Sequence, residues 1–235
     1  MNQKEINKHI FLVVSALIAV ILFFSFLEVD RLLQDSFYII AEKRWIFHKD
    51  NNQLLHFIFY DAIKRLLILF SLCILGVILF FSKRSFFNER KHGLVIVLLS
   101  MIFVPVIVGG LKASTNTPCP KNLIYYDGKY PDVKILDRYP DDFKIKSKSK
   151  CWPAGHASGG FALMSTMFFF KSRRNKILAL IFSLIIGWIM GSYKILMGDH
   201  FLSHTIVTML ISWLVILIVA KSIYSYFGKD TRKVS

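Results

Sequence analysis

The stretch "GLVIVLLSMIFVPVIVGGLK", residues 93–112, decides the fold of this chain. Apolar and small residues fill it up to Leu111, and its only charged side chain is Lys112 at the end. A hydrocarbon core about 30 Å thick is crossed by a helix of about 20 apolar residues, which is the length of this stretch. The stretch therefore predicts a transmembrane helix that ends in a lysine near the membrane surface.

Further apolar blocks of similar length lie on both sides, over residues 10–27, 66–82, 152–170, 177–197 and 201–223. The chain is 54% hydrophobic and has 22 Phe, which is typical of membrane proteins and not of soluble domains. The first block is too long for a cleaved signal peptide and lacks a small-residue cleavage site, so we expect it to be a mature helix. We find no repeat or flexible linker. The prediction is one all-α integral membrane domain over residues 1–235, with six transmembrane helices.

The net charge of +15 is distributed unevenly along the chain. Lys and Arg far outnumber acidic residues in segments 1–9, 83–92, 171–176 and 221–235, which six helices place on one side of the membrane. Short loops rich in Lys and Arg stay in the cytoplasm, so both termini are predicted to be cytoplasmic. The basicity then indicates topology and contact with anionic lipid, and no recognition motif suggests a nucleic acid partner.

Two long segments fall on the opposite side. Residues 28–65 mix apolar clusters with charges at near-helical spacing, which predicts one or two helices in the interface plane, on the periplasmic side if the chain is bacterial. Residues 112–151 form a polar, proline-containing loop, which at this length is either functional or disordered. The loop ends in "KIKSKSK", residues 144–150, which is either a solvated run or a site that attracts a lipid headgroup with several phosphates.

Five ionisable side chains cluster near the outer ends of the predicted helices: Lys112, His156, Lys194, His200 and His204. Ionisable groups at such depth are costly and usually face an interior cavity. Any single one has a structural explanation, because a lysine can extend to the interface and a histidine can bond a neighbouring helix. Five at one membrane face indicate a functional site.

Their chemistry suits a phosphate group. Lysines from two helices clamp phosphate oxygens, one histidine can attack phosphorus, and a second can protonate the departing oxygen. "PAGHASGG", residues 153–160, adds small residues whose backbone can approach a phosphate at a helix N-terminus. Gly155 and Gly159, like Gly187 and Gly191, also have the spacing of close helix packing, and of these we assign Gly155 to function.

In order and spacing, these motifs resemble the type 2 phosphatidic acid phosphatase family, whose pattern is Lys-x6-Arg-Pro, Pro-Ser-Gly-His and Ser-Arg-x5-His-x3-Asp. The first corresponds to Lys112, Cys119 and Pro120, and the second to "PAGH" at 153–156. The third corresponds to Tyr193, Lys194, His200 and His204. The resemblance covers about residues 90–215, the motif-bearing core, and includes the six-helix layout.

The resemblance implies a role for each matching residue. Lys112 and Lys194 would bind the phosphate, together with the backbone amide of Gly155. His156 would be the general acid and His200 the nucleophile that forms a phosphohistidine. Family substrates are phosphate or diphosphate esters of lipids, and the resemblance implies no cofactor and no metal.

Three positions depart from the family pattern. Cys119 replaces a phosphate-binding arginine, Ala154 a serine, and His204 the aspartate that orients the nucleophile. A neutral His204 could still accept the ring N–H of His200, but it lacks the carboxylate charge. Cys119 and Cys151 bracket the outer loop, and in an oxidising compartment they are expected to form a disulfide.

The prediction is a lipid phosphatase acting on a lipid of the lipid A, undecaprenyl diphosphate or phosphatidate class. A phosphotransferase with the same first half-reaction and a non-catalytic phospholipid-binding descendant are the alternatives. A zinc site among Cys119, Cys151, His156, His200 and His204 is less favoured, because it leaves both lysines beside a cation. We expect a multi-pass protein of a bacterial inner membrane, with its active site facing the periplasm.

Overall fold

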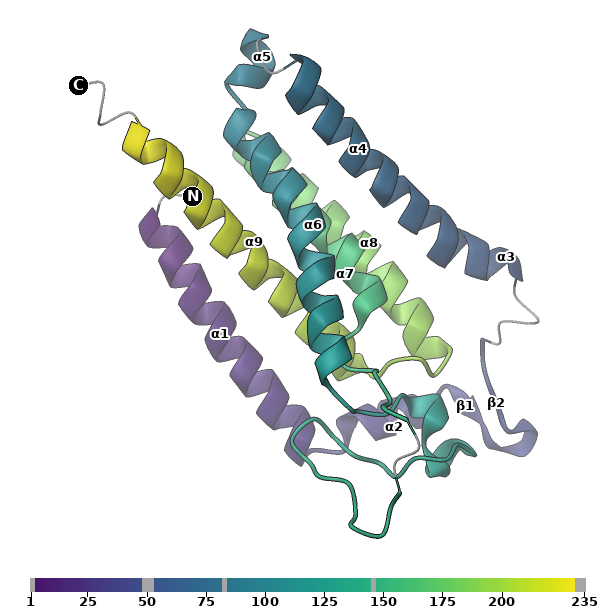
Figure 1. Cartoon of the computed structure of the whole chain (residues 1–235). Coiled ribbons are helices and arrows are strands. Elements are labelled where there is room, and N and C mark those ends of the chain that lie inside the picture. Colours follow the sequence, from purple (N-terminus) through teal and green to yellow (C-terminus); the bar gives the residue numbers. More distant parts are fainter. Residues whose placement is uncertain (1–2, 48–52, 82–83, 145–146, 231–235) are drawn as a thin grey trace.

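The computed structural model describes residues 3–47, 53–81, 84–144 and 147–230, and this part of the chain is mostly helical (Figure 1). Five of its helices are long and apolar enough to cross a membrane. They are α1 (Gln3–Phe26), the continuous helix Gln53–Phe81, α6 (Lys91–Ser114), α8 (Arg173–Leu196) and α9 (Leu202–Asp230). The helix Gln53–Phe81 consists of α3 (Gln53–His56), a π-helical turn (Phe57–Ala62) and α4 (Ile63–Phe81), and the short α5 (Ser85–Asn88) follows it. The all-α class is confirmed, and these helices indicate a multi-pass membrane protein.

The sixth span, expected over 152–170, has a different form. Here the structure has α7 (Gly155–Ala162) followed by a 3-10 segment, Leu163–Phe168. At rises of 1.5 and 2.0 Å per residue the two together extend about 24 Å, less than the hydrocarbon core. α7 packs against α6, α8 and α9, and the side chain of Phe161 is fully buried. The count of six transmembrane helices is therefore not confirmed, because this segment is a shorter helix enclosed by its neighbours.

Glycines bring α7 and α8 into close contact. A Cβ added to Gly160 of α7 would lie 2.7 Å from the Cα of Gly187 in α8. One added to Gly187 would lie 2.2 Å from the ring of Phe161, and one added to Gly191 2.4 Å from the Thr205 side chain of α9. The packing role expected of Gly187 and Gly191 is confirmed, and Gly160 brings the backbone of α7 close to that of α8.

Residues 28–47 form α2 (Val29–Asp35) and a small antiparallel hairpin of β1 (Tyr38–Ile39) and β2 (Arg44–Trp45), joined by the 3-10 turn Ile40–Glu42. Lys43 completes the turn in the left-handed region, at φ 51°. Trp45 of β2 is buried against Tyr126 of the outer loop, with ring centroids 5.0 Å apart. The expected interfacial helices over 28–65 are not confirmed, since residues 53–65 belong to the helix Gln53–Phe81 and tertiary contacts shape the rest.

α2 supports the ends of two long helices. The Gln34 side chain donates a hydrogen bond to the Ile195 carbonyl near the end of α8 (2.9 Å). The Asp30 carboxylate accepts one from the Ser203 amide at the start of α9 (2.9 Å). Backbone groups at helix ends lack partners within the helix, so these contacts supply them. The turn between α8 and α9 is thereby held at both ends.

The outer loop, residues 115–154, contains the 3-10 turns Pro120–Asn122 and Ile124–Tyr126. The Lys134 ammonium fastens it to the end of α1, by donating to the Ser25 carbonyl (3.2 Å) and pairing with Glu28 (2.9 Å). Ile145 and Lys146 of the predicted basic run 144–150 lie outside the described residues. The start of α1 and the end of α9 lie toward the far end of the bundle from this loop (Figure 1).

Candidate functional site

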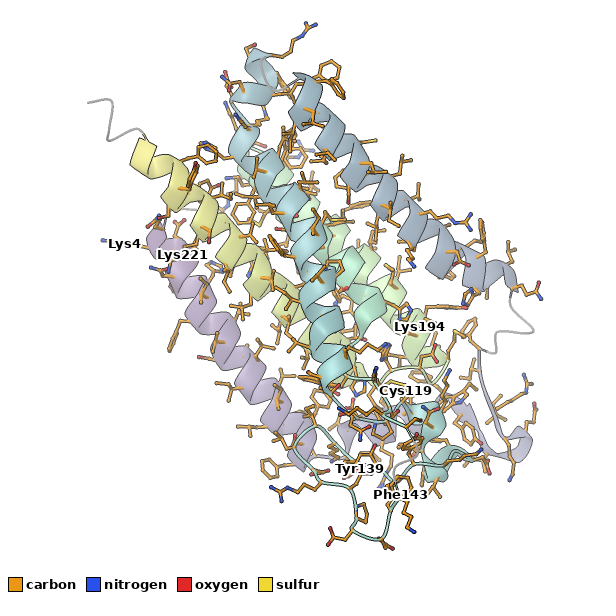
Figure 2. The ribbon with its side chains drawn as sticks, viewed as in Figure 1. Lys4, Cys119, Tyr139, Phe143, Lys194 and Lys221 are labelled. Carbon is orange, nitrogen blue, oxygen red and sulfur yellow. A yellow bond between two sulfur atoms is a disulfide. The ribbon has the colours of Figure 1, made fainter. Side chains whose placement is uncertain are left out.

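The sequence-predicted site residues come together at the end of the bundle covered by the outer loop. Lys112 is in the last turn of α6 and Lys194 in the last turn of α8. Gly155 and His156 open α7, and His200 lies in the turn between α8 and α9. Figure 2 shows Lys194 and Cys119 at this end, whereas Lys4 and Lys221 lie toward the other end.

Backbone contacts tie the three motifs to one another. The first motif is bonded to the second by Thr115, whose hydroxyl donates to the Trp152 carbonyl (2.5 Å). The second is bonded to the third by the Ala154 amide, which donates to the His204 carbonyl (3.3 Å). Directly after the first motif, the Lys121 amide donates to the Gly198 carbonyl within the third (2.9 Å). These hydrogen bonds fix the three motifs relative to one another.

The structure contains the disulfide expected between Cys119 and Cys151, with Cα atoms 5.2 Å apart. It joins the end of the first motif to the start of the second, and the Cys151 amide also donates to the Thr117 carbonyl (3.1 Å). The Cys151 sulfur lies 3.5 Å from Nδ1 of His200. The disulfide is therefore part of the wall around the expected nucleophile.

Three histidines line the centre of the site. The ring of His200 lies 6.1 Å from that of His156 and 5.8 Å from that of His204, between centroids. His200 is 2% exposed. Burial, with the charges of His204 and Lys112 beside it, holds the pKa of His200 well below its ordinary value. A neutral imidazole has a free lone pair at neutral pH, which a nucleophile requires.

His204 stands where the family has an aspartate, but it does not make the hydrogen bond to His200 that the aspartate would make. Its ring donates a hydrogen bond to the Cys151 backbone, while its Nδ1 is buried and has no hydrogen-bond partner among the described residues. The donor is therefore Nε2. The expected hydrogen bond from His200 to His204 is not formed in this part of the chain, and His200 Nδ1 faces the Cys151 sulfur instead.

Two lysines and a helix end form a cationic cradle. The Lys112 side chain lies over Gly155, its Cδ 3.6 Å from where a Cβ would be. Ala154, the residue before α7, provides no side-chain cap, so the first amides of α7 keep their capacity for an anion. The Lys194 side chain is buried, with its ammonium directed to the same region.

Asp199 pairs with two lysines, Lys194 and Lys121. These ion pairs were not predicted from the sequence. Asp199 Oδ2 lies 2.8 Å from the Lys194 ammonium and its Oδ1 2.6 Å from that of Lys121. Burial alone would raise the pKa of Asp199, but the two ammonium groups outweigh it and hold the pKa of this carboxyl below its ordinary value. In the sequence, the one sign of this pairing is a lysine, Lys121, directly after Pro120, and it lies outside the family motif.

A cavity of about 330 Å³ opens beside Gly155 and His156, between α4, α6 and α7. Lys64 lines it together with apolar residues such as Met101. A larger, almost wholly apolar cavity of about 710 Å³ shares Leu67 with it and continues between α4, α6 and α8. The phosphate cradle therefore adjoins space with the character of hydrocarbon.

Three potential metal ligands lie close together in the site. Cys151, His200 and His204 place potential ligand atoms within 4.8 Å of one another. The Cys151 sulfur is bonded to Cys119, however, and the sulfur ligand that metals select is a thiolate. In the oxidised protein this group offers two imidazoles only.

The arrangement combines a neutral imidazole, a second histidine and lysine cations at one end of the bundle, which suits phosphoryl transfer. A search of curated proteins and one of solved structures found no match. The family model of the PAP2 superfamily matches residues 93–227, more than half of the chain.

Proposed function

The chain belongs to the PAP2 superfamily, whose members are generally phosphatases or related phosphotransferases, and on this premise we propose that it is a membrane lipid phosphatase. Its substrate is a phosphate or diphosphate monoester of a lipid, and the reaction proceeds through a phosphohistidine at His200. The observation that supports this best is the convergence of His200, His156, Lys112 and Lys194 at one end of the helix bundle.

The reaction has two steps. His200 Nε2 attacks phosphorus while the bond from phosphorus to the lipid oxygen breaks, and His156 gives its proton to that oxygen. A water oxygen then attacks the phosphorus of the phosphohistidine while its bond to His200 Nε2 breaks, His156 accepts a proton from the water, and inorganic phosphate leaves. Lys112, Lys194 and the first amides of α7 neutralise the phosphoryl charge in both steps.

The two cavities support a lipid as the leaving group. A phosphate seated at Gly155 and His156 would direct its ester oxygen toward the cavity lined by Lys64 and Met101, and a hydrocarbon chain would continue beneath α4. The basic residues at 144–150 favour a headgroup with several phosphates, such as lipid A or undecaprenyl diphosphate, over phosphatidate.

In our topology the termini are cytoplasmic and the site faces the periplasm of a bacterial inner membrane. Two features support it. The described parts of the basic segments 1–9, 171–176 and 221–235 belong to the end of the bundle opposite the site. The disulfide Cys119–Cys151 is stable in an oxidising compartment.

The proposal is tested by phosphate release from the purified protein in detergent, with lipid A, undecaprenyl diphosphate, phosphatidate and phosphatidylglycerophosphate as substrates. We expect release that survives a chelator and disappears in His200→Ala and His156→Ala. Trapping ³²P on the wild type, but not on His200→Ala, identifies the intermediate. If a chelator abolishes the activity, the histidine mechanism is wrong.

Two other outcomes distinguish the alternatives. Loss of lipid phosphate without free phosphate, together with a newly phosphorylated lipid, identifies a phosphotransferase. Binding of these lipids without turnover identifies a non-catalytic descendant, which the changes at Cys119, Ala154 and His204 favour.

A further inference from the structure

Asp199 gathers two ammonium groups from different parts of the chain directly before His200. Lys194 comes from the end of α8 and Lys121 from the outer loop, and each pairs with one carboxylate oxygen, at 2.8 and 2.6 Å. An ammonium group has three N–H donors, so Lys121 keeps donors for a further acceptor while it is paired with Asp199. The carboxylate therefore orients both ammonium groups and leaves N–H donors of Lys121 for a phosphate oxygen.

The backbone holds Lys121 in place although its side chain is half exposed. Lys121 lies in the 3-10 turn Pro120–Asn122, and its amide donates to the Gly198 carbonyl (2.9 Å). Cys119, two residues earlier, is fixed by the disulfide to Cys151. Gly198 has φ +67°, and the space that its Cβ would take is filled by the indole of Trp45. Contacts on both sides of Lys121 thus keep it beside the turn that carries His200.

The charge balance shows what Lys121 adds. Lys112, Lys121 and Lys194 carry three positive charges around the single negative charge of Asp199. A phosphate monoester carries about 1.5 to 2 negative charges at neutral pH. Without Lys121, the lysines Lys112 and Lys194 offset by Asp199 would supply one net positive charge, and Lys64 in the wall of the adjoining cavity a second. Lys121 adds a further cation next to the turn that carries His200.

We propose that Lys121 binds a phosphate oxygen of the substrate and replaces the cation lost at Cys119, with Asp199 as the residue that positions Lys121 and Lys194. This inference rests on the proposed function for its substrate, a phosphate ester. It adds a cation from outside the family motif to the clamp of Lys112 and Lys194.

The test compares Lys121→Ala, Lys121→Gln and Lys121→Arg with the matched control Lys129→Ala, an exposed lysine of the same loop. We expect the first two to lower kcat/KM for lipid phosphate about 10- to 100-fold, the effect of losing one hydrogen bond to a charged group. Lys121→Arg keeps the charge and stays within about threefold of the wild type. The proposal is overturned if Lys121→Ala and Lys121→Gln match Lys129→Ala within twofold.

A double-mutant comparison separates direct binding from action through Asp199. If Lys121 contacts the phosphate, Lys121→Ala lowers kcat/KM further in an Asp199→Asn background. If Lys121 only positions Lys194 through Asp199, it has no further effect there, and the proposal is wrong.

A binding assay separates this inference from the proposed function. Inorganic phosphate is titrated against the thermal unfolding of each variant in detergent, which requires no turnover. A wild type that binds phosphate but hydrolyses no lipid phosphate refutes the proposed function, and weaker phosphate binding by Lys121→Ala still supports the role of Lys121. Equal phosphate binding by the wild type and Lys121→Ala overturns it.

Discussion

Replacing Gly160 by alanine tests whether the contact between α7 and α8 sets the geometry of the site. The new methyl group would lie 2.7 Å from the Gly187 Cα and 2.9 Å from its nitrogen. Both atoms belong to backbone, so no side chain can turn aside to make room. Carbon atoms in contact lie about 3.5 to 4.0 Å apart, and the two helices must therefore separate by about 1 Å.

This separation moves the cradle. α7 carries Gly155 and His156 in its first turn, and α8 carries Lys194 in its last. A displacement of about 1 Å between groups that act on one phosphoryl centre can cost about 100-fold in rate. We therefore expect Gly160→Ala to lower kcat/KM about 100-fold and to lower the free energy of unfolding by about 1–3 kcal/mol, as overpacking does.

The assay measures phosphate release and thermal unfolding in the same detergent. Gly76→Ala in α4 is the matched control, because nothing lies within 4 Å of its added Cβ. It is expected to keep the wild-type kcat/KM and to gain about 0.5–1 kcal/mol of stability, since alanine suits a helix interior better than glycine. The reasoning is refuted if Gly160→Ala keeps kcat/KM within twofold of the wild type.

Three further changes have defined outcomes. His204→Asp supplies a carboxylate beside His200 and should raise kcat for phosphate release; a fall in kcat with unchanged thermal unfolding contradicts this. Burial raises the pKa of Asp30 to about 6, so the folded state holds more protons than the unfolded state between about pH 4 and 6. The free energy of unfolding of the wild type should therefore fall as pH rises through this window. Asp30→Asn can still accept the hydrogen bond from the Ser203 amide, and it should remove the part of this fall that Asp30 causes. Replacing Cys119 and Cys151 by serine opens a loop of about 33 residues and should lower the free energy of unfolding by about 3–4 kcal/mol, measured by denaturation; stability equal to the wild type contradicts the disulfide.

The long helices could be predicted from apolar runs, because about 20 apolar residues have few alternatives in a membrane. α7 could not, since its apolar run gives no sign that its helical part is short and enclosed by α6, α8 and α9. The hairpin around Lys43 could not either. It depends on contacts distant in sequence, such as the Tyr38 hydroxyl that donates to the Asp127 carboxylate (2.7 Å).

The site was predictable where residues keep the family spacing, as Lys112, Lys194 and His200 do. Lys121 falls outside that spacing, and only the fold brings its ammonium to Asp199. The orientation of His204 was also beyond the sequence, because the backbone carbonyl that accepts its N–H becomes a neighbour only when the outer loop closes.

The short length of α7 has a consequence for how the protein is made. The helical part of this segment, Gly155–Phe168, is shorter than the about 20 residues that cross a membrane as one helix, and α7 packs against α6, α8 and α9. Only residues 169–172 separate it from α8, so we expect the two to enter the bilayer as a hairpin against α6. We therefore expect newly made chains to acquire the packed first turn of α7, with Gly155 and His156, only once α8 is in place, and a truncation before α8 to lack the assembled site.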